Sequence, residues 1–145
     1  MIIGIASDHA GFDLKSYLIE NFIGETIKWV NFGTNSKDSC DYPDYVHPLC
    51  KALCERKLDF GVVICGSANG VAITANKHSC VRAAICWNQE VAKLARNHNN
   101  ANVCALPARF LSNIQAREIL EVFLNSYFDG GRHLNRVEKI KLNNS

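Results

Sequence analysis

The segment Phe60–Cys65 places the strongest limit on what this chain can fold into. It reads Phe-Gly-Val-Val-Ile-Cys, so apolar side chains occupy successive positions and not only alternate ones. A strand that is apolar on both faces is typical of the middle of a parallel sheet, where both sides are covered. The segment therefore predicts a central parallel strand with helices on both faces.

The rest of the chain alternates short apolar runs with helical spacing. Pro43 follows a polar loop and suits the first turn of a helix. Five strand–helix units in succession predict an open parallel α/β sheet. The 145 residues are enough for one domain, which we expect to span 1–145. The expected strands are 2–6, 26–32, 60–65, 81–86 and 103–106, and the expected helices are 11–22, 43–56, 71–77, 89–96, 114–124 and 137–142.

Charge and cysteine usage narrow the function classes. There are 16 Lys and Arg against 14 Asp and Glu, and a net charge of +2 argues against nucleic-acid binding. No apolar stretch approaches the roughly 20 residues that cross a bilayer, so we expect no membrane association. The first residues lack the basic region of a secretory signal. Seven cysteines without a C-x-x-C pair then predict reduced thiols in a cytoplasmic protein.

Polar side chains gather where the expected strands end. Ligands of open α/β sheets bind outside the carboxyl ends of the strands. Asp8 and His9 follow the first strand, a small-residue loop follows Cys65, and Arg109 follows the fifth strand. His98 precedes the fifth strand, and the pattern leaves its side of the sheet open.

Cys65 admits two interpretations. It could be a thiolate, because the unpaired N–H groups of the loop 66–70 carry partial positive charge and can lower the pKa of a thiol. It could equally be one more buried small hydrophobe. The loop itself is either an anion-holding turn or a plain strand–helix turn. It matches neither the dinucleotide fingerprint nor the Walker A motif.

The other polar residues also have two interpretations each. Asp8 could act on a sugar hydroxyl or cap a helix, and His98 could be a general acid–base or a bystander. Arg132 and Arg136 would share one face of a helix and suit a phosphate, or they form a solvated pair. The helical spacing of His47, Cys50 and Cys54 lacks a fourth ligand, so a metal is not expected there.

Taken together, these residues resemble the type B ribose-5-phosphate isomerases, in the family that includes galactose-6-phosphate isomerase subunits and allose-6-phosphate isomerases. The resemblance covers nearly the whole chain. The segments that carry it are 7–12, 41–43, 65–70, 75–77, 96–99 and 131–133, with Arg136.

The resemblance implies a single-domain, Rossmann-like α/β/α sandwich with a five-stranded parallel sheet. It implies an enzyme of the pentose phosphate pathway without cofactor or metal, which forms a homodimer, or a tetramer, with active sites at the subunit interface. Cys65 takes the role of the base, because Val71 stands where a second branch of the family has a glutamate. The implied catalytic residues are Cys65, His98, Ser67 and Asp8, and the implied substrate-binding residues are His9, Tyr42, Gly66, Ala68, Asn69, Gly70, Asn99, Arg109, Arg132 and Arg136.

One residue departs from the family pattern. Ala68 stands where the family usually has glycine. If the backbone there needs a positive φ, alanine costs about 1 kcal/mol or shifts the loop.

Three other functions stay open. A cysteine phosphatase has the signature C-x5-R, which would require arginine where this chain has Val71. A flavodoxin-like domain that binds a phosphorylated ligand would need neither Cys65 nor His98. An isomerase of a six-carbon sugar 6-phosphate differs only in the length of its pocket.

Overall fold

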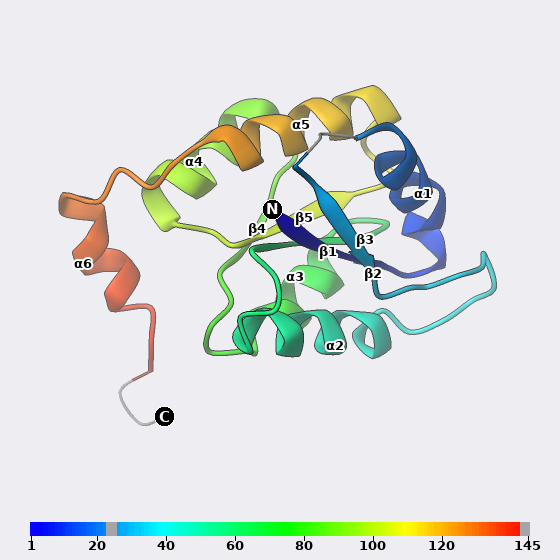
Figure 1. The fold of residues 1–145 in the computed structure, drawn as a ribbon, viewed down its shortest axis with the longest axis horizontal. Helices are drawn as coiled ribbons and strands as arrows, with labels where there is room; N and C mark the ends of the chain where they lie inside the picture. The colour runs from blue at the N-terminus through cyan, green and yellow to red at the C-terminus, as the bar shows by residue number, and fades with distance from the viewer. Residues whose placement is uncertain (23–25, 143–145) are drawn as a thin grey trace.

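The computed structural model describes residues 1–22 and 26–142. Five parallel strands form one sheet in the order β2-β1-β3-β5-β4 (Figure 1). The strands are β1 (Ile2–Ser7), β2 (Lys28–Asn31), β3 (Phe60–Cys65), β4 (Ala83–Ile85) and β5 (Val103–Pro107). The helices are the 3-10 turn η1 (His9–Gly11), α1 (Phe12–Asn21), α2 (Pro43–Cys54), α3 (Asn69–Ala75), α4 (Gln89–Asn99), α5 (Asn113–Asn125) and α6 (Arg132–Glu138).

The predicted α/β class is confirmed, and β3 has the predicted bounds. Its interior residues are fully buried because a layer of helices covers each face of the sheet. Val62 and Ile64 pack under α1, α4 and α5, whereas Val63 and Cys65 pack under α2 and α3. Figure 1 shows the same two layers above and below the sheet. The alternation of a strand thus turns the Cys65 side chain toward the α2–α3 layer.

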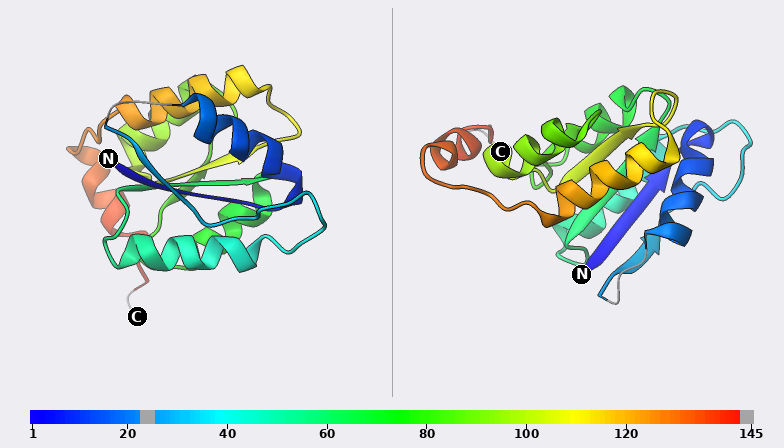
Figure 2. Two further views of the ribbon diagram at one scale, coloured as in Figure 1. Left: turned by 45° about the vertical axis from the view of Figure 1, so that its right-hand side comes forward. Right: turned by 90° about the horizontal axis from the view of Figure 1, so that it is seen from above.

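The rim strands and the helices near the amino edge differ most from their predicted bounds. β2 covers 28–31 in place of the predicted 26–32, and α4 runs to Asn99 in place of residue 96. β4 covers three residues in place of the predicted six, because it pairs only with β5 at the rim of the sheet. The last helix, predicted over 137–142, is α6 and begins at Arg132. α6 has no buried residue and lies beside the end of α4 (Figure 2). An exposed helix carries no apolar periodicity from which its start could be found.

The prediction that all thiols are reduced is wrong for one pair. Cys54, the last residue of α2, forms a disulfide with Cys80, which lies between α3 and β4, and their Cα atoms are 5.6 Å apart. The other five cysteines are free. Spacing along the chain gives no sign of this bond, because the folding of α2 beside α3 brings the two residues together.

None of the helices in the described segments is both long enough and apolar enough to span a membrane.

Candidate active site

A pocket of about 500 Å³ lies at the carboxyl edge of the sheet. This edge is where open α/β sheets bind their ligands, and the volume suits a small molecule. The sheet brings together here side chains from the ends of β1, β3 and β5 and from the start of α2. The lining residues are Asp8, His9, Ala10, Tyr42, Cys65, Gly66, Ser67, Gly70, Arg109 and Phe110.

Cys65 lines this pocket as the last residue of β3. It is 5% exposed, so it is mostly enclosed but not sealed in the core. Its carbonyl accepts a hydrogen bond from Ala108 N at 2.9 Å, and Gly66 O accepts one from Arg109 N at 3.0 Å. These bonds fasten the segment after β5 to the end of β3. They therefore place the Arg109 side chain beside the loop that follows the thiol.

Two glycines of this loop lie close to neighbouring side chains, and at Gly70 the space is too small for a Cβ unless Tyr42 moves. A Cβ at Gly66 would lie 3.1 Å from Cδ, Nε and Cζ of Arg109. A Cβ at Gly70 would lie 2.6 Å from Cε1 and Oη of Tyr42. Both glycines let a neighbouring polar side chain approach the loop closely. The loop and its two neighbours thus form one packed wall of the pocket.

Ala68 adopts the left-handed conformation that its position led us to consider. Its φ is 65° and its ψ is −6°, and the residue is fully buried. Its carbonyl accepts from Ala72 N at 3.1 Å and begins α3, while Ser67 Oγ accepts from Asn69 N at 3.3 Å. Ala68 does not line the pocket, and Asn69 lines a neighbouring groove. The alanine therefore keeps the turn at the expense of backbone strain.

Asp8 is a helix cap, and it also lines the pocket. Its Oδ1 accepts from Ala10 N at 3.0 Å and from Gly11 N at 3.1 Å. The capping interpretation is thus confirmed. Because Asp8 is only 7% exposed and follows β1 directly, the cap fixes a carboxylate at the pocket wall.

His9 is oriented by a residue that the sequence did not single out. Its Nδ1 accepts a hydrogen bond from Cys40 N at 3.3 Å. The neutral imidazole therefore carries its proton on Nε2, which is a donor suited to an anion. Cys40 lies in the loop between β2 and α2, 31 residues after His9 in the sequence, and no motif marks it.

The remaining predicted residues do not reach this pocket. His98 and Asn99 end α4, and α4 leads into the start of β5. They therefore lie at the amino edge of the sheet, separated from the pocket by a five-residue strand, or about 16 Å. Arg132 and Arg136 lie in α6, at this same edge. Figure 1 shows α6 at the opposite end of the molecule from α1.

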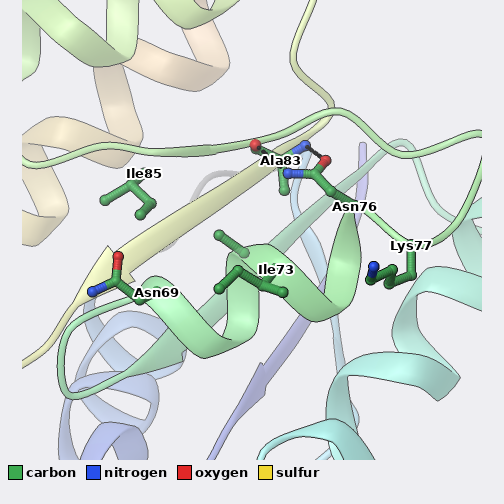
Figure 3. Close-up of a pocket in the computed structure, with 7 residues that line it drawn as sticks. Asn69, Ile73, Asn76, Lys77, Ala83 and Ile85 are labelled. Atoms are coloured by element: carbon green, nitrogen blue, oxygen red, sulfur yellow. Dashed lines mark hydrogen bonds between the residues drawn. The ribbon is translucent and has the colours of Figure 1, made fainter. Parts of the chain in front are cut away.

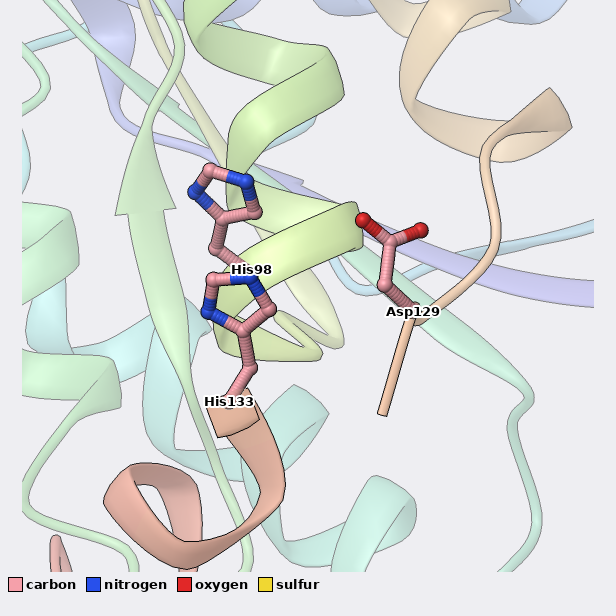
Figure 4. A group of neighbouring side chains, drawn as sticks. All are labelled: His98, Asp129 and His133. Atoms are coloured by element: carbon pink, nitrogen blue, oxygen red, sulfur yellow. The ribbon is translucent and has the colours of Figure 1, made fainter. Parts of the chain in front are cut away.

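A second group of polar side chains lies at the amino edge of the sheet. It consists of His98, Asp129, Arg132, His133 and Arg136. The rings of His98 and His133 are 4.1 Å apart between centroids and tilted by 14° (Figure 4). Asp129 N donates to Asn97 O at 2.9 Å, which ties the segment before α6 to α4. Arg132 shares a helix with Arg136, whose Nη1 donates to the Arg132 carbonyl at 3.0 Å.

The second group suits an anion better than a cation. One ligand atom each of His98, Asp129 and His133 lies within 4.8 Å of the others. A metal ion lies in the plane of an imidazole that binds it, and two nearly parallel stacked rings do not offer converging lone pairs. Desolvation, with nearby His98 and Arg132, lowers the pKa of His133 and so favours its neutral form, which leaves the arginines of α6 as the source of positive charge. The arginines add positive charge that suits a phosphate.

Comparison with known proteins agrees with the observed fold. The Ribose/Galactose Isomerase family matches residues 3–140. Ribose-5-phosphate isomerase B of Escherichia coli is 35% identical over 138 residues, which cover 95% of this chain and 93% of the relative.

Two solved structures are similar over almost their whole length. A ribose 5-phosphate isomerase from Thermotoga maritima has a TM-score of 0.94 and 42% identity, covering 97% of each chain. Ribose-5-phosphate isomerase B from Mycoplasma genitalium, solved with bound ribulose-5-phosphate, has a TM-score of 0.90 and 38% identity, covering 96% of this chain and 93% of the other. Because the family model matches most of the chain and these relatives are similar almost from end to end, the chain belongs to the Ribose/Galactose Isomerase family.

Proposed function

We propose that this chain is an aldose–ketose isomerase that interconverts D-ribose 5-phosphate and D-ribulose 5-phosphate. The observation that carries the proposal is the position of Cys65, at the end of the central strand, in a pocket that also holds Arg109. The relatives named for this sugar phosphate, one of them solved with ribulose-5-phosphate, support the substrate. The reaction belongs to the non-oxidative branch of the pentose phosphate pathway, in the cytoplasm.

Cys65 is the base of the proposed reaction. Its thiolate takes the proton from C2 of the open-chain aldose, and the electron pair of that C–H bond forms the C1–C2 double bond of an enediolate. The same sulfur returns the proton to C1 while the hydroxyl proton of O2 passes to O1, which leaves the ketose. The backbone N–H groups of residues 66–70 would stabilise the developing oxyanion, and Ser67 would orient the proton transfer.

Ring opening assigns a role to the second group. Ribose 5-phosphate exists mostly as a furanose, so a proton must reach the ring oxygen before C2 is attacked. His98 suits this transfer because an imidazole can both donate and accept a proton near neutral pH. Asp8 lies on the ring-oxygen side in this assignment, and His9, Arg109, Arg132 and Arg136 hold the phosphate away from the reacting carbons. Tyr42 and Asn99 line the substrate.

One chain does not bring all of these residues together. Cys65 and His98 lie at opposite edges of its sheet. We therefore infer a homodimer in which each site takes Cys65 from one protomer and His98 with the α6 arginines from its partner.

A groove beside the pocket supports this dimer. It lies between α3 and the rim strand β4, has a volume of about 410 Å³, and is lined at its centre by Ile73 and Ile85 (Figure 3). Ile73 is 64% exposed, and β4 has a neighbour on one side only. Asn69 lines this groove, and it is also the first residue of α3, the helix that follows the Cys65 loop. A second copy seated here would lie next to the pocket.

The other candidate functions are less well supported. Val71 is buried where a cysteine phosphatase needs its arginine. A six-carbon substrate is tested directly by a panel of ribose 5-phosphate, allose 6-phosphate and galactose 6-phosphate, measured as ketose formed. We expect the ribose ester to have the largest kcat/KM. Ketose formed mainly from a six-carbon ester would move the substrate assignment, and binding without turnover of any ester would refute an isomerase.

Subunit mixing tests the shared site. Cys65→Ala and His98→Asn variants are each impaired alone. If each site draws these residues from two protomers, a mixed dimer regains one intact site out of two. Random exchange at equal concentrations makes half of the dimers mixed, so about a quarter of wild-type activity should return. No recovery after verified exchange would show that both residues act within one chain.

A further inference from the structure

Arg96 is a buried cation close to His98. It is 8% exposed and lies in the last turn of α4, two residues before His98. Within residues 1–22 and 26–142, no carboxylate oxygen lies within ion-pair distance of its guanidinium. Burying a charge without an opposite charge is unfavourable unless hydrogen bonds compensate it. The contacts that Arg96 makes therefore show what the buried charge stabilises.

The guanidinium holds the turn that follows α4. Nη1 donates to Asn100 Oδ1 at 3.1 Å and to Ala101 O at 2.6 Å. Asn100 caps the helix in the left-handed conformation, with a φ of 48°. Arg82 Nε donates to the carbonyl of the same asparagine at 2.8 Å. Two arginines thus fix the turn that ends the segment carrying His98.

The same guanidinium also reaches the chain that leads to α6. Nε of Arg96 donates to Ser126 O at 3.3 Å, directly after α5. Its Cζ lies 5.0 Å from the centroid of Phe60 and 5.8 Å from that of Phe123, so the cation stacks on two aromatic side chains. One buried side chain therefore connects the end of α4 with the start of the segment 126–131.

Among residues 1–22 and 26–142, few other contacts fix the position of α6. It buries no residue of its own. Besides the Arg96 contact, the bond from Asp129 N to Asn97 O and the stacking of His133 on His98 hold this segment to α4. Any shift of the α4 end would therefore move His98 and the α6 arginines together.

We propose that Arg96 is a positioning residue for the isomerase reaction, which holds the ring-opening His98 and the phosphate-binding arginines of α6 in one arrangement. This inference rests on the proposed function. Arg96 does not touch the substrate. It acts through the turn at Asn100 and through Ser126.

The test separates ring opening from proton transfer between carbons. Ribulose 5-phosphate cannot close a furanose ring because its O5 carries the phosphate. Exchange of its C1 proton with deuterated water therefore needs Cys65 but no ring opening. Isomerisation of ribose 5-phosphate needs both. The ratio of the two maximal rates measures the contribution of His98, and a loss of folded protein lowers both rates equally.

Arg96→Lys keeps the charge but lacks the planar fork that bonds to both Asn100 and Ser126. We expect its kcat for ribose 5-phosphate to fall about 10- to 100-fold, as a displacement near 1 Å can produce, while saturated C1 exchange falls far less. KM for both sugars should rise, because the α6 arginines move too. Asn100→Gly keeps the left-handed turn, removes only the Oδ1 acceptor and should shift the ratio in the same direction.

Ile119→Val is the matched control, since it loosens the buried face of α5 without touching the turn. It should leave the rate ratio at the wild-type value. If the two arginine-contact variants also keep that ratio and the KM values, Arg96 is structural only and the inference is refuted. A wild-type protein that catalyses neither reaction would instead refute the proposed function and, with it, this inference.

Discussion

Reducing the Cys54–Cys80 disulfide should destabilise the fold by an amount that follows from the loop that it closes. The two cysteines are 26 residues apart in the sequence. Opening a loop of that length returns about 12 cal/mol/K of entropy to the unfolded chain, which corresponds to about 3.5 kcal/mol at 25 °C. A 145-residue chain unfolds with an entropy of about 0.3 kcal/mol/K, so the melting temperature should fall by about 12 °C.

The assay is thermal unfolding by circular dichroism with and without dithiothreitol. The Cys54→Ser/Cys80→Ser double variant should melt near the temperature of the reduced wild type and should not respond to reductant. Cys50→Ala is the matched control: it alters a buried free thiol on the same helix and should keep the full response to reductant. A wild-type melting temperature that is unchanged by complete reduction, verified by thiol counting, would refute the loop-entropy reasoning.

Three further predictions concern the loop and one histidine pair. Gly70→Ala should displace the Tyr42 ring and raise KM for the sugar phosphate, at a stability loss of about 1–3 kcal/mol; an unchanged KM would contradict the close packing. Ala68→Gly should leave the free energy of unfolding in urea nearly unchanged. Glycine relieves about 1–2 kcal/mol of backbone strain, but it also raises the entropy of the unfolded chain and removes a buried methyl group. A fall in the free energy of unfolding above about 2 kcal/mol would show that the left-handed turn is not strained. Burial, with nearby His47, lowers the pKa of His78 from 6.5, so the unfolded chain binds this proton more readily and stability declines as the pH falls below 6.5. His78→Gln should therefore shrink the drop in melting temperature between pH 7 and pH 5, and an undiminished drop would exclude His78 as its source.

The sequence predicts the centre of the fold better than its rim. β3 could be predicted to the residue because burial on both faces leaves an unbroken apolar run. The run 81–86 looks like a longer strand than β4, because Val81 is buried by packing outside the ladder and Cys86, whose N–H bonds to Ala105 O of β5, is buried just past the end of the strand. Apolar patterns report burial, and burial at a rim does not require strand pairing.

The residues of the candidate site also differ in how well the sequence predicts their positions. Residues that directly follow a strand, such as Asp8, Cys65 and Arg109, lie in the pocket as the topology requires. The sequence could not place His98 at either edge of the sheet. The predicted helix ends at residue 96, which leaves His98 in a loop, whereas α4 extends to Asn99 and carries His98 at the amino edge. The contact of Cys40 with His9 depends on the path of a long loop, which local patterns do not encode.

The measurement that tests the account most directly is the exchange of the C1 proton of ribulose 5-phosphate with deuterated water, compared between wild type and Cys65→Ala. This exchange isolates the one step that we assign to the sulfur. Loss of the base should reduce its rate by about 10²- to 10⁴-fold while the variant stays folded. A Cys65→Ala protein that exchanges the proton within about tenfold of the wild-type rate would contradict the role of Cys65 as the base, since a general base contributes more than that.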